Sequence, residues 1–249
     1  MLFASGLVLF SISPAAEDIS PAAEESGEDT QANANGYATI ESIKNMKGLT
    51  CTVQIKTNKL RTYYVYRQTG QPQDYKYLRD HGCSTCALGS VLNSARGYNY
   101  TPAYLHKKLI PKKLGRRHTK PIKLYGIHKI LKKYKIYSKF VPRFSKSSAK
   151  KNLTRWLKKG GIAIVTVKSG ADNKWTKHHH SFLLLGIMEN GDVIVGDSAM
   201  ENYQGNKRIK TAPMNEIVKY MIPCTSSRYT YCWPGTNTAG GYILTRISK

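Results

Sequence analysis

The sequence predicts an α+β protein in which helices come first and an antiparallel sheet follows. Two sets of segments and one turn predict this class. Four segments with helical spacing of apolar residues lie within residues 83–160, and four apolar segments typical of strands follow from residue 162 onward. The turn signal "ENGD" at residues 189–192 joins two of these strands as a hairpin. With 249 residues, 41% of them hydrophobic, the chain can bury a sizeable core without metal or disulfide support.

The first elements of the globular part precede the helices. The segment "ATIESIKNMKGLTC" (residues 38–51) predicts a short helix that ends near Gly48. The segment "LRTYYVYRQ" (60–68) is rich in β-branched and aromatic residues and predicts a strand that ends at Gln68. Gly and Pro in "TGQPQDY" (69–75) then indicate a turn.

Each of the four helices has its own signals. After Gly82, apolar residues fall at 0, +3, +4 and +8 from Cys83, and Gly97 ends this helix. The segment "TPAYLHKKL" begins a second helix with Thr101 as its cap and a proline at the first helical position. The segments "LYGIHKILKKYKI" and "SSAKKNLTRWLKKGG" predict the third and fourth, the latter starting at a serine cap and ending at glycines.

Four strands complete the predicted fold. They are "IAIVTV" (162–167), "SFLLLGIM" (181–188), "VIVGD" (193–197) and "GYILTRI" (241–247). There is no internal repeat, and residues 37–249 are expected to form one domain.

The N-terminal residues differ from the rest in composition. The apolar run "LFASGLVLFSI" (2–12) and the small residues that follow predict a signal peptide over residues 1–16. No Lys or Arg precedes Lys44, which departs from the usual basic start of such a signal, and a buried core strand is the alternative. Residues 17–36 carry six acids, no base and no aromatic side chain, which is typical of a disordered linker. We therefore expect a secreted or cell-surface protein.

The positive charge is confined to the globular part. The whole chain has a formal net charge of +24, and all 39 Lys and Arg residues lie from Lys44 onward. A field of this size attracts polyanions. The chain lacks zinc-finger spacing, RNP-like aromatic motifs and a helix-turn-helix signature, which argues against nucleic acid. An anionic cell-wall polymer or lipid surface fits an exported protein better, and a solvated basic surface without a partner is the alternative.

An odd number of cysteines raises the question of a reactive thiol. The five are Cys51, Cys83, Cys86, Cys224 and Cys232. Cys224 and Cys232 are close enough in sequence for a small bridged loop, although spacing alone does not fix the connectivity.

Three polar residues stand where the pattern predicts rigid elements. Cys83 lies in the first turn of a helix, where free backbone N–H groups and the macrodipole favour a thiolate. His180 precedes an apolar strand and is a candidate general base. Asp197 ends the next strand of the hairpin, where it could accept the imidazole N–H. Each residue alone has an ordinary interpretation, as a core cysteine, a surface histidine and a turn former. Their joint placement predicts a Cys, His, Asp catalytic site.

The same motifs carry a family resemblance. Together, "GCSTCALGSVLN", "TPAYL", "HSFLLLG" and "GDVIVGDSA" resemble the papain-like cysteine peptidases of the bacteriocin-processing type and their secreted relatives in Gram-positive bacteria. The resemblance covers roughly residues 64–197. It implies a papain-like fold with Cys83 as nucleophile, His180 as general base and Asp197 as the orienting residue.

The resemblance also implies a glutamine before the nucleophile, whose amide helps to stabilise the oxyanion. Gln68, Gln71 and Gln73 are the candidates, and Gln68 is preferred because it ends a strand. Two positions depart from the family pattern: Ser84 replaces a common glycine, and Ser198 a common proline after the aspartate. These departures leave room for a divergent substrate or an inactive relative.

Cys86 lies one turn into the same helix and is expected to be a packed, neutral thiol. Zinc binding by Cys83, Cys86 and two of the histidines 178–180 is disfavoured, because a second close Cys pair is absent and consecutive strand residues point to opposite faces. We expect neither a metal nor a cofactor.

The sequence thus predicts an exported cysteine peptidase or amidase that acts on a peptide or cell-wall peptide. A cell-wall endopeptidase or acyl-transferring enzyme of the NlpC type is the alternative within the enzymes. From a different class, the chain could be a non-catalytic module that binds polyanions through its basic surface. A membrane-active toxin is a third alternative, against which the apolar helix faces argue because the core uses them.

Overall fold

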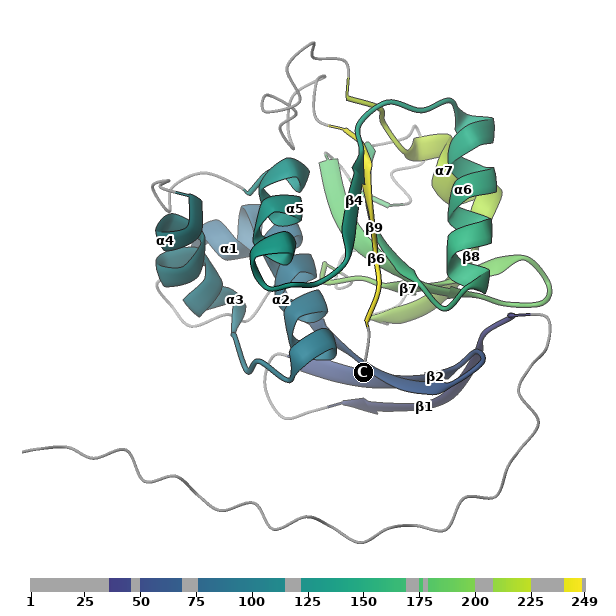
Figure 1. Cartoon of the computed structure of the whole chain (residues 1–249), viewed down its shortest axis with the longest axis horizontal. Helices are drawn as coiled ribbons and strands as arrows, with labels where there is room; N and C mark the ends of the chain where they lie inside the picture. The colour runs from purple at the N-terminus through teal and green to yellow at the C-terminus, as the bar shows by residue number, and fades with distance from the viewer. Residues whose placement is uncertain are drawn as a thin grey trace, which may run out of the picture. The chain divides into compact units, whose positions relative to one another are not determined.

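A computed structural model of the chain describes residues 36–45, 50–68, 76–114, 122–168, 175–176, 179–199, 208–224 and 240–247. All of these residues belong to one compact unit. Its elements are shown in Figure 1 and run in the order β1 (Thr39–Asn45), β2 (Thr50–Lys56), β3 (Leu60–Tyr66), α1 (Lys76–His81), α2 (Cys83–Arg96), α3 (Pro102–Tyr104), the π-helix η1 (Leu105–Leu109), α4 (Ile110–Leu114), α5 (Leu124–Lys133), β4 (Ser138–Val141), α6 (Lys146–Lys158), β5 (Ile162–Lys168), β6 (His179–Ile187), β7 (Asp192–Gly196), β8 (Ile209–Pro213), α7 (Met214–Tyr220) and β9 (Tyr242–Thr245).

The described strands form two antiparallel sheets. Six of them pair in the order β4-β9-β5-β6-β7-β8, and β1, β2 and β3 form a second sheet in sequence order. The hairpin β6-β7 is confirmed, with Ile187 opposite Val193 next to the "ENGD" turn. The chain is therefore a mixed α+β protein with antiparallel sheets, as the sequence predicts.

The prediction of a short helix over residues 38–51 is wrong. Residues Thr39–Asn45 form strand β1, which pairs antiparallel with β2. Ile40 and Ile43 are three residues apart, which suits one face of a helix. In the structure Ile43 is half exposed, while alternate residues of β2 are buried. Pairing with β2 decides the conformation, since strand preference depends on such contacts more than on local sequence. A sheet consequently precedes the helices, and the expected order of helices followed by a sheet is only partly correct.

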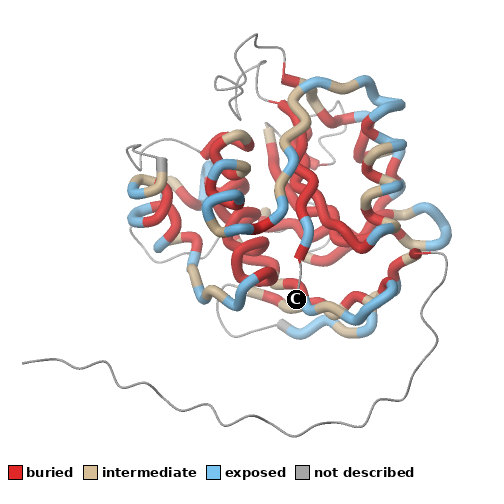
Figure 2. Tube along the Cα trace, in the orientation of Figure 1, coloured by how far each residue is buried: buried red, intermediate tan, exposed pale blue. Residues whose placement is uncertain are grey.

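Helices and the smaller sheet cover both faces of the six-stranded sheet. On one face α6 and α7 pack against the even side chains of β6, through the cluster that contains Leu153, Ile217 and Leu184. On the other face the core joins α2, α5 and the three-stranded sheet to side chains such as Ile164 and Leu183 (Figure 1). Figure 2 shows the central strands buried along their length, with exposed residues on the outer helices. Burial on both faces explains why these strands are continuous apolar runs.

Helix α2 is the most deeply buried helix, with every residue from 83 to 95 buried. Its serines bind the edge of β3: Ser90 Oγ accepts from Tyr66 N at 3.1 Å, and Ser94 Oγ accepts from Tyr64 N at 2.9 Å. Backbone donors of an edge strand need partners when they are buried, and these hydroxyls supply them. The contacts fix α2 against β3 and thereby fix the position of its first residue, Cys83.

The predicted helix start at Thr101 is confirmed by its cap, because the Thr101 side chain accepts from Tyr104 N. The fourth predicted helix has a serine cap, but this cap is Ser145, two residues before the predicted segment, and it forms a capping box with Ser148. Helices α1 and α7 and strands β2, β4 and β8 were not among the predicted elements. No helix in the described part of the chain combines the length and apolarity needed to cross a bilayer.

Candidate active site

Cys83 is the first residue of α2 and follows Gly82, which separates this helix from α1. Gly82 N donates to Leu78 O at 2.7 Å, and a Cβ atom on Gly82 would lie 2.2 Å from that oxygen. The Gly82 N–H thus continues the hydrogen bonding of α1 by one residue, and a side chain at this position would collide with the Leu78 carbonyl. The Gly82 position provides no side-chain cap for α2, and the backbone N–H of Ser84, in the first turn, donates to the Cys83 sulfur.

His180 and Asp197 lie on neighbouring strands and contact each other directly. His180 is the second residue of β6, and Asp197 follows the last residue of β7. The His180 Nε2 atom is 2.6 Å from Asp197 Oδ1. Both side chains are buried, with relative exposures of 5% and 1%. The hairpin therefore brings together the two residues that the sequence placed on its adjacent strands.

The Cys83 thiol completes this arrangement by interacting with His180. Burial opposes ionisation of the thiol, but a hydrogen bond to His180 and the charge of that imidazole, with N–H donors of Ser181 and Ser84, lower the pKa of Cys83. Burial likewise disfavours the imidazolium, yet Asp197 and Cys83 raise the pKa of His180 to about 10. Because Asp197 occupies Nε2, the ring offers Nδ1 to the thiol. These interactions together favour a buried thiolate and imidazolium pair.

Among the residues that the structure describes, three groups donate hydrogen bonds to Asp197. Besides His180, the Lys210 Nζ atom lies 2.8 Å from Oδ2, and Ala199 N donates to Oδ1 at 2.9 Å. Burial disfavours the carboxylate, but the charges and hydrogen bonds of His180 and Lys210 hold the pKa of Asp197 well below its ordinary value. Asp197 is therefore an ionised carboxylate that orients the imidazole ring through its Nε2 atom.

Gln68, the preferred oxyanion donor, is buried just beyond β3. Its backbone N donates to Ser198 O at 2.9 Å, which ties the end of this segment to the residue after Asp197. Its side-chain Nε2 donates to Arg79 O at 2.7 Å, and its Oε1 atom is buried without a partner. One amide hydrogen is therefore committed to α1 and the second remains available. Gln71 and Gln73 lie outside the described residues.

The residues that depart from the family pattern have definite contacts. Ser84 is buried and its hydroxyl donates to Ile122 O at 2.9 Å, which links α2 to the segment before α5. Ser198 offers its carbonyl to Gln68, while its own Oγ is buried without a partner. Neither serine displaces Cys83, His180 or Asp197 from the site.

Cys86 lies one turn below Cys83 and is fully buried. Its thiol donates to Arg67 O at 3.8 Å, and burial together with the neighbouring Cys83 raises the pKa of Cys86 far above its ordinary value. Cys86 is thus a neutral, packed thiol. Cys51 is also a free, buried cysteine. Cys224 is disulfide-bonded, while the predicted partner, Cys232, lies outside the described residues.

Within the described ranges, no three His, Cys, Asp or Glu side chains are arranged to hold a metal ion. His179 is the first residue of β6, and His178 lies outside the described residues.

Sequence reasoning missed Lys210 and Trp175. Lys210 lies in β8 with 6% of its side chain exposed, and its Nζ atom is 4.9 Å from the centroid of the Trp175 ring. Trp175 is buried and stacks on Phe182 of β6 with ring centroids 4.9 Å apart. A lysine in a chain with so many lysines gives no signal of its own. The alternation of "RIKTAP", which places Lys210 on the same side of a strand as an apolar alanine, is the one available hint.

No known protein family matches the chain, and no curated protein matches it. The interpretation of the site therefore rests on its residues and their geometry.

Proposed function

We propose that this chain is a cysteine peptidase or amidase with a papain-like α+β fold. The observation that carries the proposal is the buried chain of contacts from the Cys83 thiol through His180 to Asp197, with the pKa of the thiol lowered and that of the imidazole raised. Perturbed pKa values in a set of nucleophile, base and orienting carboxylate are the properties that covalent catalysis by a thiol requires. The resemblance of the sequence motifs to the bacteriocin-processing peptidases supports the same reaction.

In the proposed reaction the Cys83 thiolate attacks the carbonyl carbon of an amide. A C–S bond forms, and the carbonyl π electrons move onto oxygen to give a tetrahedral oxyanion. When the oxyanion collapses, the C–N bond breaks and the His180 imidazolium gives its proton to the leaving amine. The acyl group remains on Cys83 as a thioester. The neutral His180 then takes a proton from water as the water oxygen bonds to the thioester carbon. Collapse of this second oxyanion breaks the C–S bond, which releases a carboxylic acid and restores the Cys83 thiolate and the His180 imidazolium.

Two donors are proposed to hold the oxyanion. The Cys83 backbone N–H belongs to the uncapped first turn of α2, where the helix dipole also favours negative charge. The second donor is the remaining amide hydrogen of Gln68, whose position is fixed by its bonds to Ser198 and Arg79.

The proposal is tested by labelling the full chain with a peptidyl vinyl sulfone and measuring intact mass. The wild-type chain should gain one adduct at neutral pH, whereas Cys83→Ala should gain none and His180→Ala should react far more slowly. Cys51→Ala is the matched control, because Cys51 is also a buried free thiol but has a raised pKa. Equal labelling of wild type and Cys83→Ala would overturn the assignment. Wild-type turnover of a mixed peptide library, lost in Cys83→Ala, would then separate an active enzyme from an inactive relative.

The substrate class is proposed as a peptide or cell-wall peptide, and the protein as exported through residues 1–16. Acyl transfer to an amine in place of water uses the same residues, and mass spectrometry of the products formed with an added amine distinguishes the two outcomes.

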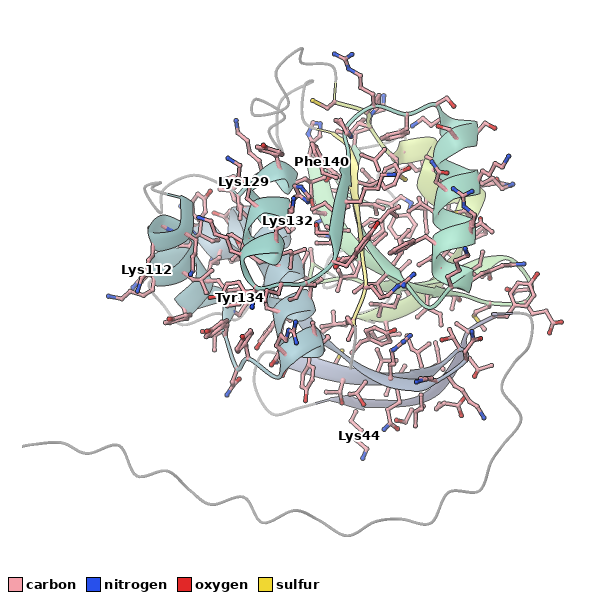
Figure 3. All side chains as sticks on the ribbon, viewed as in Figure 1. Lys44, Lys112, Lys129, Lys132, Tyr134 and Phe140 are labelled. Atoms are coloured by element: carbon pink, nitrogen blue, oxygen red, sulfur yellow. The ribbon has the colours of Figure 1, made fainter. Side chains whose placement is uncertain are left out.

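A second candidate function is binding to an anionic polymer or lipid surface of the cell wall. It is favoured by the distribution of charge, because residues 81–171 contain 22 Lys and Arg and no Asp or Glu. Surfaces without such a role usually mix both signs. Figure 3 shows Lys112 on α4 and Lys129 on α5 projecting outward from neighbouring helices. Binding through these charges should weaken steeply as salt rises, and it should be unchanged in Cys83→Ala. Salt-independent binding to teichoic acid or anionic vesicles would exclude it.

A further inference from the structure

A buried lysine, Lys210, pairs with the carboxylate of Asp197 next to the proposed nucleophile and base. The Lys210 Nζ atom is 2.8 Å from Asp197 Oδ2, on the side of the carboxylate away from Oδ1, which faces His180. The side chains of Lys210 and Asp197 are 6% and 1% exposed, and the ammonium group also lies 4.9 Å from the Trp175 ring centroid. This lysine is therefore held by a buried carboxylate and an aromatic face and has little access to solvent.

The four groups together are electrically balanced. In the form active for attack, Cys83 and Asp197 are anions, while His180 and Lys210 are cations. Without the lysine, the same buried site would carry a net charge of −1. Burial penalises an unbalanced charge, and the site would respond by retaining a proton. The lysine thus removes a reason for the Cys83 thiol to remain protonated.

We propose that Lys210 is a positioning residue that balances the charge of Asp197 and so sets the pH range over which the thiolate and imidazolium pair exists. This inference rests on the proposed function. Removing a positive charge favours the protonated form of every neighbouring group, because each proton then meets less repulsion. Loss of Lys210 should therefore move both the formation of the Cys83 thiolate and the deprotonation of His180 to higher pH.

The charged neighbours of the Lys210 and Asp197 pair come from several elements. His180 lies on β6, Asp197 follows β7, and Cys83 acts through His180 from α2. Helix α7, which also packs against β8, carries Glu216 and Lys219.

Arg208, at the residue before β8, interacts with Cys51 and Arg67, so it acts on a different thiol. Lys210 forms a direct salt bridge with Asp197 and is therefore the residue to substitute in a test.

The experiment measures the rate of Cys83 alkylation by iodoacetamide against pH in the full chain, with the adduct located by peptide mass mapping. Lys210→Met removes the charge and keeps the length of the side chain. Lys210→Gln removes the charge but keeps a donor for Asp197, and Lys210→Arg keeps both charge and donor. The profile should show two inflections, one for formation of the Cys83 thiolate and one for deprotonation of His180. We expect both to move up by about one pH unit in Lys210→Met and Lys210→Gln. Lys210→Arg should keep the wild-type profile.

The variants separate the charge of Lys210 from its contact. If Lys210→Gln matches the wild type in both inflections, the residue acts through its hydrogen bond alone and the inference is wrong. Lys210→Gln also keeps the test decisive if Lys210→Met does not fold. The proposed function fails separately, if wild-type Cys83 itself is alkylated only near the pH of an ordinary thiol. A shifted profile in Lys210→Gln supports the inference.

Discussion

Replacing Asp197 by alanine should lower the stability of the folded protein. The substitution removes the acceptor for His180 Nε2 at 2.6 Å, for Lys210 Nζ at 2.8 Å and for Ala199 N at 2.9 Å. Lys210 then loses its counter-charge, while His180 retains Cys83 as its anionic partner. Breaking a buried ion pair by removing one partner costs about 3–5 kcal/mol, and we expect Asp197→Ala to lower the free energy of unfolding by this amount at neutral pH.

The assay is urea unfolding followed by circular dichroism, with the midpoint and slope fitted for each variant. Asp192→Ala is the matched control, because Asp192 begins β7, the strand that Asp197 follows, and its partly exposed carboxylate accepts from the nearby Asn190. It should cost about 1 kcal/mol or less. The double variant Asp197→Ala, Lys210→Met should be more stable than the sum of its single changes predicts, since no lysine is left unpaired. A cost below about 1 kcal/mol for Asp197→Ala would refute the account of a buried charge network.

Two further predictions follow from the backbone around Cys83 and from the pKa of Asp197. Gly82→Ala should reduce the rate of Cys83 alkylation at least tenfold, because the added Cβ would lie 2.2 Å from Leu78 O. Gly97→Ala, at the other end of α2, has open space around the added Cβ. It should cost only about 1–2 kcal/mol of stability and leave the alkylation rate unchanged. Equal rates in the two variants would contradict the role of Gly82. The depressed pKa of Asp197 contributes stability above the ordinary aspartate pKa of about 3.9, and this contribution is lost as the pH falls through the folded-state value. Acid titration of Asp197→Asn should therefore show a shallower loss of stability than the wild type, and identical curves would contradict this assignment.

Local signals in the sequence were sufficient for most of the elements that form the site. The start of α2 could be predicted because Gly82 and the apolar spacing that follows it are local features. The hairpin β6-β7 could be predicted because its turn is short and its strands are apolar. His180 and Asp197 lie on the two arms of that hairpin, but the pairing shifts by one residue between Leu184 and Gly186, and this irregularity, which decides the face on which Asp197 lies, had no signal in the sequence.

Long-range contacts decided the parts that the sequence did not predict. Strand β1 exists because β2 pairs with it, a contact that the local sequence of residues 38–51 does not reveal. Lys210 belongs to the site because β8 pairs with β7 and Trp175 covers the lysine. Neither contact can be predicted from a lysine in a basic chain. For Gln68, local sequence predicted the end of a strand but not the bond of its amide to Arg79.

The most direct test of the central claim is the ultraviolet absorbance of the Cys83 thiolate as a function of pH. The signal is the difference between wild type and Cys83→Ala, repeated in a His180→Ala background. The contact with His180 lowers the pKa of Cys83, so the thiolate should form below the ordinary cysteine pKa of about 8.5, and this shift should be lost when His180 is replaced. A Cys83 thiol that titrates at the ordinary cysteine pKa of about 8.5, with or without His180, would contradict it.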